Sequence, residues 1–259
     1  MILQQEFLVI HEWCKENFME LNLCKCKCIT YTRKSNSNKI VFNYGINETF
    51  ITRCSIMNDL GIMIDERVTM NDHVDYVTGK ARRSLGFVKR HAKDFNDPYV
   101  TKALYCAIVR PTLEYCIVSW MPFTQVQINK LESIQRQFLL FALRNLGWND
   151  GYQLPKYEDR LKLLQLDTLN DRRILINASF MYKLLNGKID AIYLKDQLNL
   201  NESRYATRNR PTFVHNQHST SYGMNEPITR LTKLYNMFSC EFVESNSVDI
   251  LKTKIKQKL

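Results

Sequence analysis

Glycine is scarce in this sequence, with eight residues among 259. No segment has the glycine spacing of a phosphate-binding loop, and neither a G-x-S-x-G nor an H-E-x-x-H motif is present. No two aspartates are adjacent anywhere in the sequence. These absences exclude the common sequence patterns of nucleotide-binding loops, serine hydrolases and zinc proteases.

Long hydrophobic runs are also missing. The longest unbroken apolar run covers the seven residues 103–109, which is too short to cross a bilayer. No basic segment followed by an apolar core opens the sequence, so we expect no cleaved secretory signal and no membrane partner. Eight cysteines are too few for a disulfide scaffold of this length. We therefore expect reduced thiols and an intracellular location, in the nucleus or the cytoplasm.

Positive charge is what the sequence has in excess. Lys and Arg number 36 against 26 Asp and Glu, so the net charge is +10. Hydrophobic residues at 45% and charged residues at 24% are ordinary for a globular protein, and the length suffices for one or two domains with a core. The basic excess favours a nucleic acid as partner ahead of an anionic membrane surface.

Three cysteines alternate with two lysines in segment 24–28. Structural zinc sites use C-x₂₋₄-C pairs with a second pair at a distance, and this segment has neither. On a strand, Cys24, Cys26 and Cys28 would share one face while Lys25 and Lys27 share the other. We interpret the segment as a half-buried strand with a basic outer face and expect no metal ligands. A zinc site formed by the three cysteines is the alternative.

Hydrophobic periodicity predicts the fold class. Apolar residues at three- and four-residue steps predict a helix over 3–21, and short alternating segments predict strands between 24 and 64. From residue 65 onward almost all segments have a helical pattern. The prediction is a mainly α protein with a small antiparallel β element near the N-terminus, an α+β fold.

Start and stop signals divide the helical part. Asn71 or Asp72 would cap a helix that reaches about residue 94, Asp97-Pro98 would start another, and Thr124 would open a long amphipathic helix. Further helices are expected over 161–169, 172–185, 228–242 and 248–258, with a polar loop over 199–226.

Basic residues concentrate in the helix expected from 71 onward. They are Lys80, Arg82, Arg83, Lys89, Arg90 and Lys93. At 100° per residue, Arg82, Lys89 and Lys93 share one side of this helix, and Arg83 and Arg90 flank it. Such a surface would neutralise several phosphates and release counterions. The alternative is an ordinary solvated helix face.

Two weaker signals have structural interpretations. Lysines at every second position over 252–258 would spread around a helix, which indicates a solubilising tail. His215 and His218 lie in the expected polar loop, where we interpret them as solvated side chains rather than ligands.

The order of motifs along the chain adds a family resemblance. The first set is Trp13-Cys14, Asn17, Met19, Leu21-Asn22, Lys25-Cys26, Ile29 and Tyr31. It resembles the palm helix and the lysine-bearing strand, motif D, of jockey-type non-LTR retrotransposon reverse transcriptases. Further motifs resemble the primer-grip hairpin and the thumb of that family. They are Ile46, Ile51, Asp59-Leu60-Gly61, His73, Lys80-Ala81, Leu85-Gly86-Phe87 and Arg90. The likeness continues to about residue 190 through Arg110-Pro111, Glu114-Tyr115 and Arg172-Arg173.

The resemblance implies a role for some of these residues. Lys25 matches the lysine proposed to protonate the leaving pyrophosphate, and Leu60 and Gly61 match the hairpin that positions the primer end. The basic helix 80–93 would lie along the primer–template duplex and contact its backbone. Glu48 and Asn58 depart from the family, which usually has Gly and Lys there. For Glu114, a buried pair with an arginine is the simplest interpretation.

The resemblance also implies what this polypeptide cannot do. The aspartates that hold two Mg²⁺ ions in the parent polymerase lie upstream of the palm helix in that family. We therefore expect no polymerase activity, no catalytic residue and no cofactor in this chain. The expected parts are a palm remnant (1–65), a thumb-like region (66–150) and a helical C-terminal extension (151–259).

These expectations lead to a truncated reverse transcriptase fragment that binds RNA, DNA or a hybrid without sequence preference. The alternatives are a helical protein–protein interaction module and a non-functional retroelement remnant. The sequence leaves the oligomeric state open.

Overall fold

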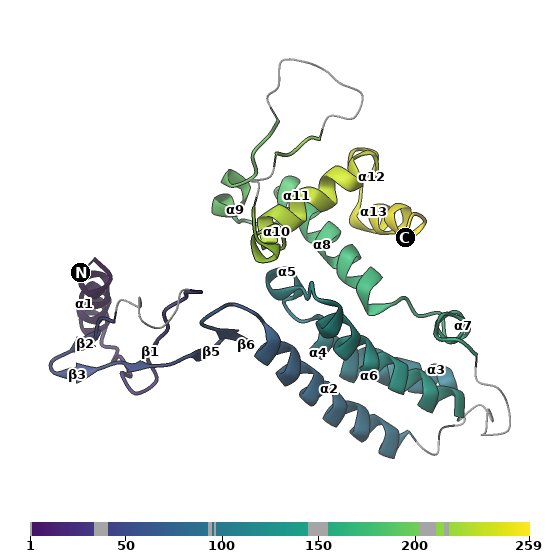
Figure 1. Ribbon diagram of the computed structural model, residues 1–259, viewed down its shortest axis with the longest axis horizontal. Coiled ribbons are helices and arrows are strands. Elements are labelled where there is room, and N and C mark those ends of the chain that lie inside the picture. Colours follow the sequence, from purple (N-terminus) through teal and green to yellow (C-terminus); the bar gives the residue numbers. More distant parts are fainter. Residues whose placement is uncertain are drawn as a thin grey trace. The chain divides into compact units, whose positions relative to one another are not determined.

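The computed structural model describes residues 2–33, 41–92, 95, 97–144, 155–201, 211–214 and 218–259 (Figure 1). They form two compact units, Met1–Tyr76 and Val77–Leu259. Each unit is considered by itself. The boundary expected at residue 150 lies outside the described residues.

The chain is mainly helical with small two-stranded sheets near the N-terminus, which confirms the predicted fold class. The strands are β1 (Lys27–Cys28), β2 (Gly45–Ile46), β3 (Thr49–Phe50), β4 (Thr52–Arg53), β5 (Ile56–Asp59) and β6 (Ile62–Asp65). The first helices are α1 (Ile2–Glu16) and α2 (Asn71–His91). Those after α2 are α3 (Pro98–Leu104), η2 (Tyr105–Val109), α4 (Arg110–Glu114), α5 (Ile117–Trp120), α6 (Gln125–Arg144), α7 (Tyr157–Leu163), α8 (Leu169–Leu185), α9 (Ile192–Asp196), α10 (Ser221–Met224), α11 (Pro227–Met237), α12 (Ser239–Val243) and α13 (Val248–Lys256).

Helix α1 is shorter than the pattern predicted, because a C-terminal cap ends it at Glu16. Phe18 adopts a left-handed backbone with φ +56°. The Met19 N–H donates to the Cys14 carbonyl at 2.8 Å and the Phe18 N–H donates to the Lys15 carbonyl at 3.1 Å. These two bonds form a Schellman motif with Phe18 where glycine is usual. The apolar residues beyond Glu16 therefore do not extend the helical stripe, and Phe18 is fully exposed.

The strands of the first unit are also shorter than expected, and one pairing differs in direction. Strands β2 and β3 pair antiparallel, as do β5 and β6, whereas β1 and β4 pair parallel. The β1–β4 pair therefore departs from the antiparallel pairing expected for this β element. Two-residue strands expose most of their side chains, and this unit buries few apolar residues.

A buried aspartate organises the turn between β6 and α2. The Asp65 carboxylate accepts hydrogen bonds from the backbone N–H groups of Arg67, Thr69 and Met70 at 2.9, 2.8 and 3.1 Å. It also accepts the Thr69 hydroxyl at 2.9 Å. The turn contains two left-handed residues, Val68 and Met70, and helix α2 begins directly after it at Asn71.

Local signals start the helices of the second unit where the sequence predicted. Asp97 caps α3 by accepting the Tyr99 N–H at 2.7 Å, and Pro98 occupies the first helical position. Thr124 and Gln127 form a reciprocal capping box before α6, with side chain-to-backbone distances of 3.3 and 3.5 Å. These caps confirm both predicted starts.

The helical run continues past Pro111. The segment before it, η2, is a π-helical turn, and α4 continues from Arg110 with Pro111 near its start. Proline lacks a backbone N–H, so the wider turn places it where no hydrogen bond is lost.

The core of the second unit lies around α6 and α8. Fully buried side chains include Phe138 and Leu139 on α6 and Met181 on α8. Helices α11, α12 and α13 pack on the other part of α8, where Leu231, Phe242, Leu251 and Ile255 are buried. Figure 1 shows α8 between α6 on one side and helices α11 and α13 on the other.

Buried polar groups join α4, α6 and α8. The Arg172 guanidinium donates to both carboxylate oxygens of Glu114, with an Nη2–Oε2 distance of 2.9 Å. Only 13% of the Glu114 side chain is exposed, which confirms the predicted buried pair with an arginine. Deeper inside, one Glu132 oxygen accepts the Tyr157 hydroxyl and the Leu169 N–H. Arg173 lies fully buried, and burial lowers its pKa while the Glu132 carboxylate raises it.

Lysines near the C-terminus form ion pairs. Lys254 pairs with Glu244 at 2.8 Å and Lys256 with Asp167 at 2.5 Å. Lys258 pairs with Glu241 in the same way. His218 is half-buried, 3.2 Å from Glu226 Oε1 and hydrogen-bonded to Thr229. His215 lies outside the described residues.

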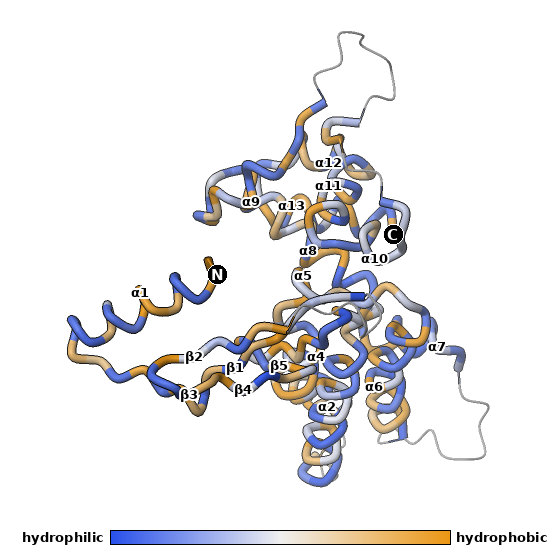
Figure 2. The backbone as a smooth tube through the Cα atoms, turned by 60° about the vertical axis from the view of Figure 1, so that its left-hand side comes forward, coloured by the Kyte–Doolittle hydropathy of each residue, from blue (hydrophilic) through white to orange (hydrophobic). Residues whose placement is uncertain are grey.

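Among the described residues, no helix combines the length and the hydrophobicity that crossing a bilayer requires. Figure 2 shows polar and apolar residues mixed along the longest helices, α2 and α6.

Candidate nucleic-acid interface

Helix α2 has one buried and one basic face. Val77, Ala81, Leu85 and Val88 recur at three- and four-residue steps and are at most 5% exposed. This stripe faces the core of the second unit, where α2 runs alongside α6 (Figures 1 and 2). The basic side chains predicted to bind phosphates occupy the remaining circumference.

Arg83 and Arg90 lie at the centre of the exposed face. Both side chains fold back along the helix over a glycine. An Arg83 guanidinium nitrogen lies 3.9 Å from the ideal Cβ position of Gly79, and its Arg90 counterpart lies 3.6 Å from that of Gly86. The arrangement repeats after seven residues, so the two guanidinium groups follow each other along one side, about 10 Å apart along the axis. A bare glycine backbone leaves room for the arginine beside it.

Lys80 and Arg82 are also exposed on α2. Neither they nor Arg83 and Arg90 form an ion pair with another residue in the described part of the chain. Lys93 lies outside the described residues. Unpaired arginines present all their donors to solvent, where a phosphate can accept them.

Lys89 is placed differently from the other basic residues. It is half-buried, and its ammonium lies 5.9 Å from the centre of the Phe141 ring on α6. Burial lowers its pKa, and the nearby Arg144 lowers it further. Lys89 thus contacts the core as well as solvent, so it is a weaker candidate for phosphate binding than Arg83 or Arg90. The position of Lys89 along its helix does not by itself reveal the contact with Phe141, because Phe141 lies on another helix.

An exposed aromatic residue adjoins the arginines, and sequence reasoning did not select it for binding. Phe87 is 47% exposed, and its ring centre lies 4.3 Å from that of His91. An exposed ring between arginines offers a base-stacking surface beside phosphate-binding groups. The helical angle between Phe87 and Arg83 is small enough that a helical wheel would have found the pair.

The basic cluster also has a purely structural benefit. Lys89, Arg90 and His91 occupy the last turn of α2, where positive charge stabilises the helix dipole. Arg82 and Arg83 lie too far from the helix end for this effect, which decays within one turn.

Leu60 and Gly61 form the tip of the β5–β6 hairpin in the first unit. Their φ angles are +47° and +89°, the pattern of a type I′ turn. The register pairs Asp59 with Ile62 and Ile56 with Asp65. The Leu60 side chain is 84% exposed at this tip. The predicted hairpin is therefore present, while its role in primer positioning stays a prediction.

Segment 24–28 agrees with its predicted pattern only in part. Lys25 and Lys27 are exposed and Cys26 and Cys28 are half-buried, but Cys24 is exposed and lies in a turn before β1. The predicted three-cysteine face was wrong at Cys24, because only Lys27–Cys28 has strand hydrogen bonding.

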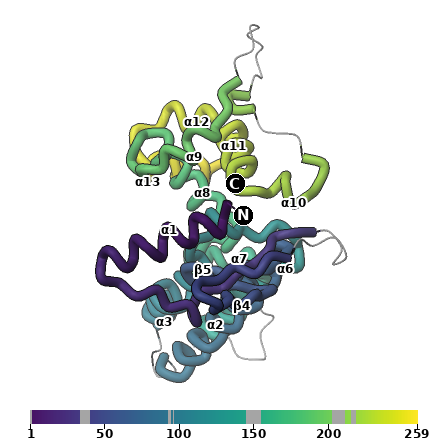
Figure 3. Tube along the Cα trace, turned by 90° about the vertical axis from the view of Figure 1, so that its left-hand side faces the viewer, coloured from purple at the N-terminus to yellow at the C-terminus, as the bar shows by residue number. Residues whose placement is uncertain are grey.

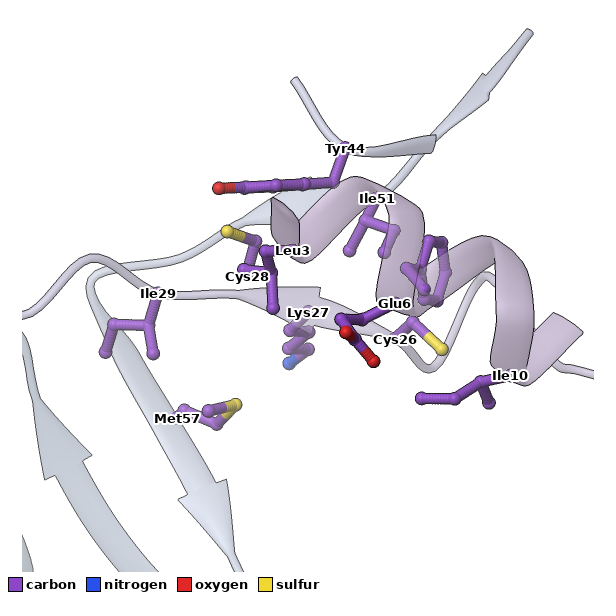
Figure 4. Close-up of a pocket in the computed structure, with 11 residues that line it drawn as sticks. Leu3, Glu6, Ile10, Cys26, Lys27, Cys28, Ile29, Tyr44, Ile51 and Met57 are labelled. Carbon is purple, nitrogen blue, oxygen red and sulfur yellow. The ribbon is translucent and has the colours of Figure 1, made fainter. Parts of the chain in front are cut away.

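Cys26 and Cys28 line an apolar cavity of about 400 Å³ between α1 and the strands (Figure 4). Leu3 and Ile10 of α1 also line it, and Figure 3 shows α1 as the dark purple tube beside the strands. Among the described residues, no three His, Cys, Asp or Glu side chains are grouped to hold a metal ion.

Comparison of the chain with models of known protein families finds no match, and neither curated proteins nor solved structures show a detectable similarity. The likeness to reverse transcriptases therefore remains a prediction from the residues.

Proposed function

We propose that this chain binds RNA, DNA or an RNA–DNA hybrid without sequence preference, through the exposed basic face of α2, and that it does not polymerise. The proposal includes the origin suggested by the resemblance, namely the palm edge, thumb and C-terminal extension of a retroelement reverse transcriptase. An intracellular location, in the nucleus or the cytoplasm, belongs to the same proposal.

The arrangement of Arg83 and Arg90 carries the proposal. Each guanidinium is exposed and without an ion-pair partner in the described chain, and the two follow one line along the helix. Such a row can neutralise successive phosphates, and Phe87 adds a ring for stacking. The net charge of +10 supports attraction over a longer distance.

A salt titration tests the proposal. Filter binding is measured with a labelled RNA–DNA hybrid, a single-stranded RNA and a DNA duplex of the same sequence, each at rising salt. We expect similar affinities for unrelated sequences and a linear fall of the logarithm of affinity with the logarithm of salt. Absence of binding at low salt, or binding without a salt slope, would contradict the proposal.

A matched pair of variants locates the surface. Arg83→Glu with Arg90→Glu should weaken binding about tenfold or more across all sequences and reduce the salt slope by about one to two. Lys183→Glu with Lys195→Glu changes the net charge equally at exposed positions on α8 and α9. Equal weakening by both pairs would show a diffuse charge effect and remove α2 as the interface.

The exposed apolar side chains of α1 favour a second candidate, a protein–protein interaction module. Ile2, Val9 and Trp13 are 77%, 65% and 55% exposed. Apolar area of this kind is typical of a surface that a partner covers. Sedimentation analysis of the wild type and of Val9→Glu with Trp13→Glu would test it. Self-association that the double variant abolishes would support this function, whereas monomers in both proteins would argue against a homotypic role.

A further inference from the structure

Phe87 is an exposed aromatic residue among cations on α2. A single exposed ring is ordinary on a protein surface, so its neighbours decide what it can bind. Phe87 is 47% exposed, and the exposed Arg83 and Arg90 lie four residues before and three residues after it. These spacings place the three side chains on one side of the helix. Residues 76–91 contain no Asp or Glu, so this surface combines an aromatic ring with uncompensated positive charge.

His91 holds the ring of Phe87 in place. The two ring centres are 4.3 Å apart, with 46° between the ring planes. This contact restricts the rotation of the Phe87 side chain before any ligand arrives, which lowers the entropy lost on binding. A fixed ring beside cations is an arrangement with which proteins stack nucleic-acid bases.

The guanidinium of Arg90 reaches the helical turn that carries the ring. It lies 3.6 Å from the ideal Cβ position of Gly86, the residue directly before Phe87. The Arg83 guanidinium lies over Gly79, about 10 Å farther along the helix axis. A nucleotide with its base on the ring can therefore place a phosphate at Arg90, and a phosphate farther along the same strand can reach Arg83.

Charge and stacking favour different forms of nucleic acid. A duplex carries one phosphate per about 1.7 Å of its axis, against about 3.4 Å for one strand, so cations alone favour the duplex. In a duplex, however, neighbouring bases cover the faces of each base, and only the base edges are open in the grooves. An unpaired strand exposes its base faces to an aromatic ring. The ring on α2 therefore opposes the preference that charge alone would give.

We propose that the exposed face of α2 binds single-stranded nucleic acid in preference to a duplex, with an unpaired base stacked on Phe87 and nearby phosphates bound by Arg83 and Arg90. RNA and DNA strands share this chemistry, and the ring has no hydrogen-bonding group that would select one base. The inference rests on the proposed function and adds to it the form of nucleic acid that is bound.

Three oligonucleotides separate stacking from charge. They are a single-stranded DNA of about 12 residues, its blunt duplex, and a strand of equal length in which every residue is abasic. In anisotropy titrations of the full chain at one salt concentration, the single strand should bind at least about threefold more tightly than the duplex and about tenfold more tightly than the abasic strand. Equal or tighter binding of the duplex or of the abasic strand would overturn the inference alone. Absence of binding to all three would contradict the proposed function and the inference with it.

Substitutions of Phe87 test the ring itself. Phe87→Leu keeps an apolar side chain without an aromatic face and should weaken single-strand binding about tenfold, while duplex and abasic affinities stay within about twofold. Phe87→Trp should retain the preference for the single strand. Tyr193→Leu on α9 removes another exposed ring, away from this face, and should leave all three affinities unchanged. A preference that survives in Phe87→Leu, or that Tyr193→Leu also removes, would overturn the inference.

Tryptophan fluorescence shows whether a base contacts this position. The wild type has three tryptophans, so the emission that Phe87→Trp adds is measured as a difference from the wild type. The single strand should quench the added emission, because a stacked base quenches indole fluorescence, and the abasic strand should not. Neither strand should quench the emission that Tyr193→Trp adds. Emission of the Phe87→Trp variant that the single strand leaves unchanged would overturn the inference.

Discussion

The two compact units bury their apolar residues to very different degrees. In the first unit, Ile46, Ile62 and Val74 are buried, while α1 has no buried residue and most of its large apolar side chains remain exposed. In the second unit, α6 alone buries Leu131, Ile134, Phe138 and Leu139. Two-residue strands offer a helix little surface to pack against, whereas long helices crossing one another cover most of each other's apolar stripes. An apolar stripe along a helix therefore stabilises the fold strongly only where other helices cover it, as they do for α6 and not for α1.

The largest expected effect comes from matched truncations in the two units. Leu139→Ala on α6 removes a fully buried side chain and should lower the free energy of unfolding by about 3 to 4 kcal/mol. Ile10→Ala on α1 removes a side chain that is 51% exposed and should cost below about 1 kcal/mol. Urea unfolding followed by circular dichroism measures both. Similar costs would mean that α1 is packed as tightly as α6 and would break the comparison.

A second contrast concerns acidic residues. Glu132→Gln removes the carboxylate that most strongly offsets the burial of the Arg173 charge and should destabilise the protein by about 2 to 3 kcal/mol. Glu12→Gln on α1 removes an exposed pair with Lys15, and we expect no measurable change in the unfolding midpoint. If the two variants unfold alike, Glu132 does not compensate Arg173.

The first unit carries a pH-dependent contact of intermediate size at His73. Burial lowers the pKa of His73 to about 4 in the folded chain, and its Nδ1 accepts the Met63 N–H at 3.2 Å. The folded state therefore binds the proton less readily than the unfolded state, whose histidine pKa is about 6.5. The contribution of His73 is complete above about pH 6.5 and falls as the pH decreases toward 4, by about 3 kcal/mol.

Proton NMR of the His73 ring should give the lowered pKa directly, and the Met63 amide should lose protection from hydrogen exchange as the ring protonates. His73→Gln should flatten the pH dependence of unfolding between pH 4 and 6.5. A ring that titrates near 6.5 would show that His73 is exposed to solvent and that its hydrogen bond with the Met63 N–H is not formed.

The smallest expected effect is local and should not differ between the units. Leu60 in the first unit and Gln165 in the second both have left-handed backbones, with φ of +47° and +48°. Leu60→Asn and Gln165→Asn should each raise the unfolding free energy by about 0.5 to 1 kcal/mol, because asparagine tolerates this conformation better. Thermal unfolding measures both gains. A gain at only one position would show that packing, rather than backbone strain, decides the effect.

Sequence patterns predicted part of the candidate interface and part of the fold. The exposed positions of Arg83 and Arg90 followed from helical periodicity, and the Leu60-Gly61 turn followed from its residues. The contact of Lys89 with Phe141 could not be predicted, because it joins two helices separated by some fifty residues along the chain.

The sequence by itself determined the helical class, the caps at Asp97 and Thr124, the basic charge of α2 and the absence of adjacent aspartates. These features depend on residues within a few positions of one another, whose geometry the backbone dictates. Only the tertiary structure decided that Lys254 pairs with Glu244 and that Asn177 keeps an oxygen without a hydrogen bond in the described chain. Such contacts depend on which helices pack together, and packing is chosen by the summed burial of the whole unit rather than by any local signal.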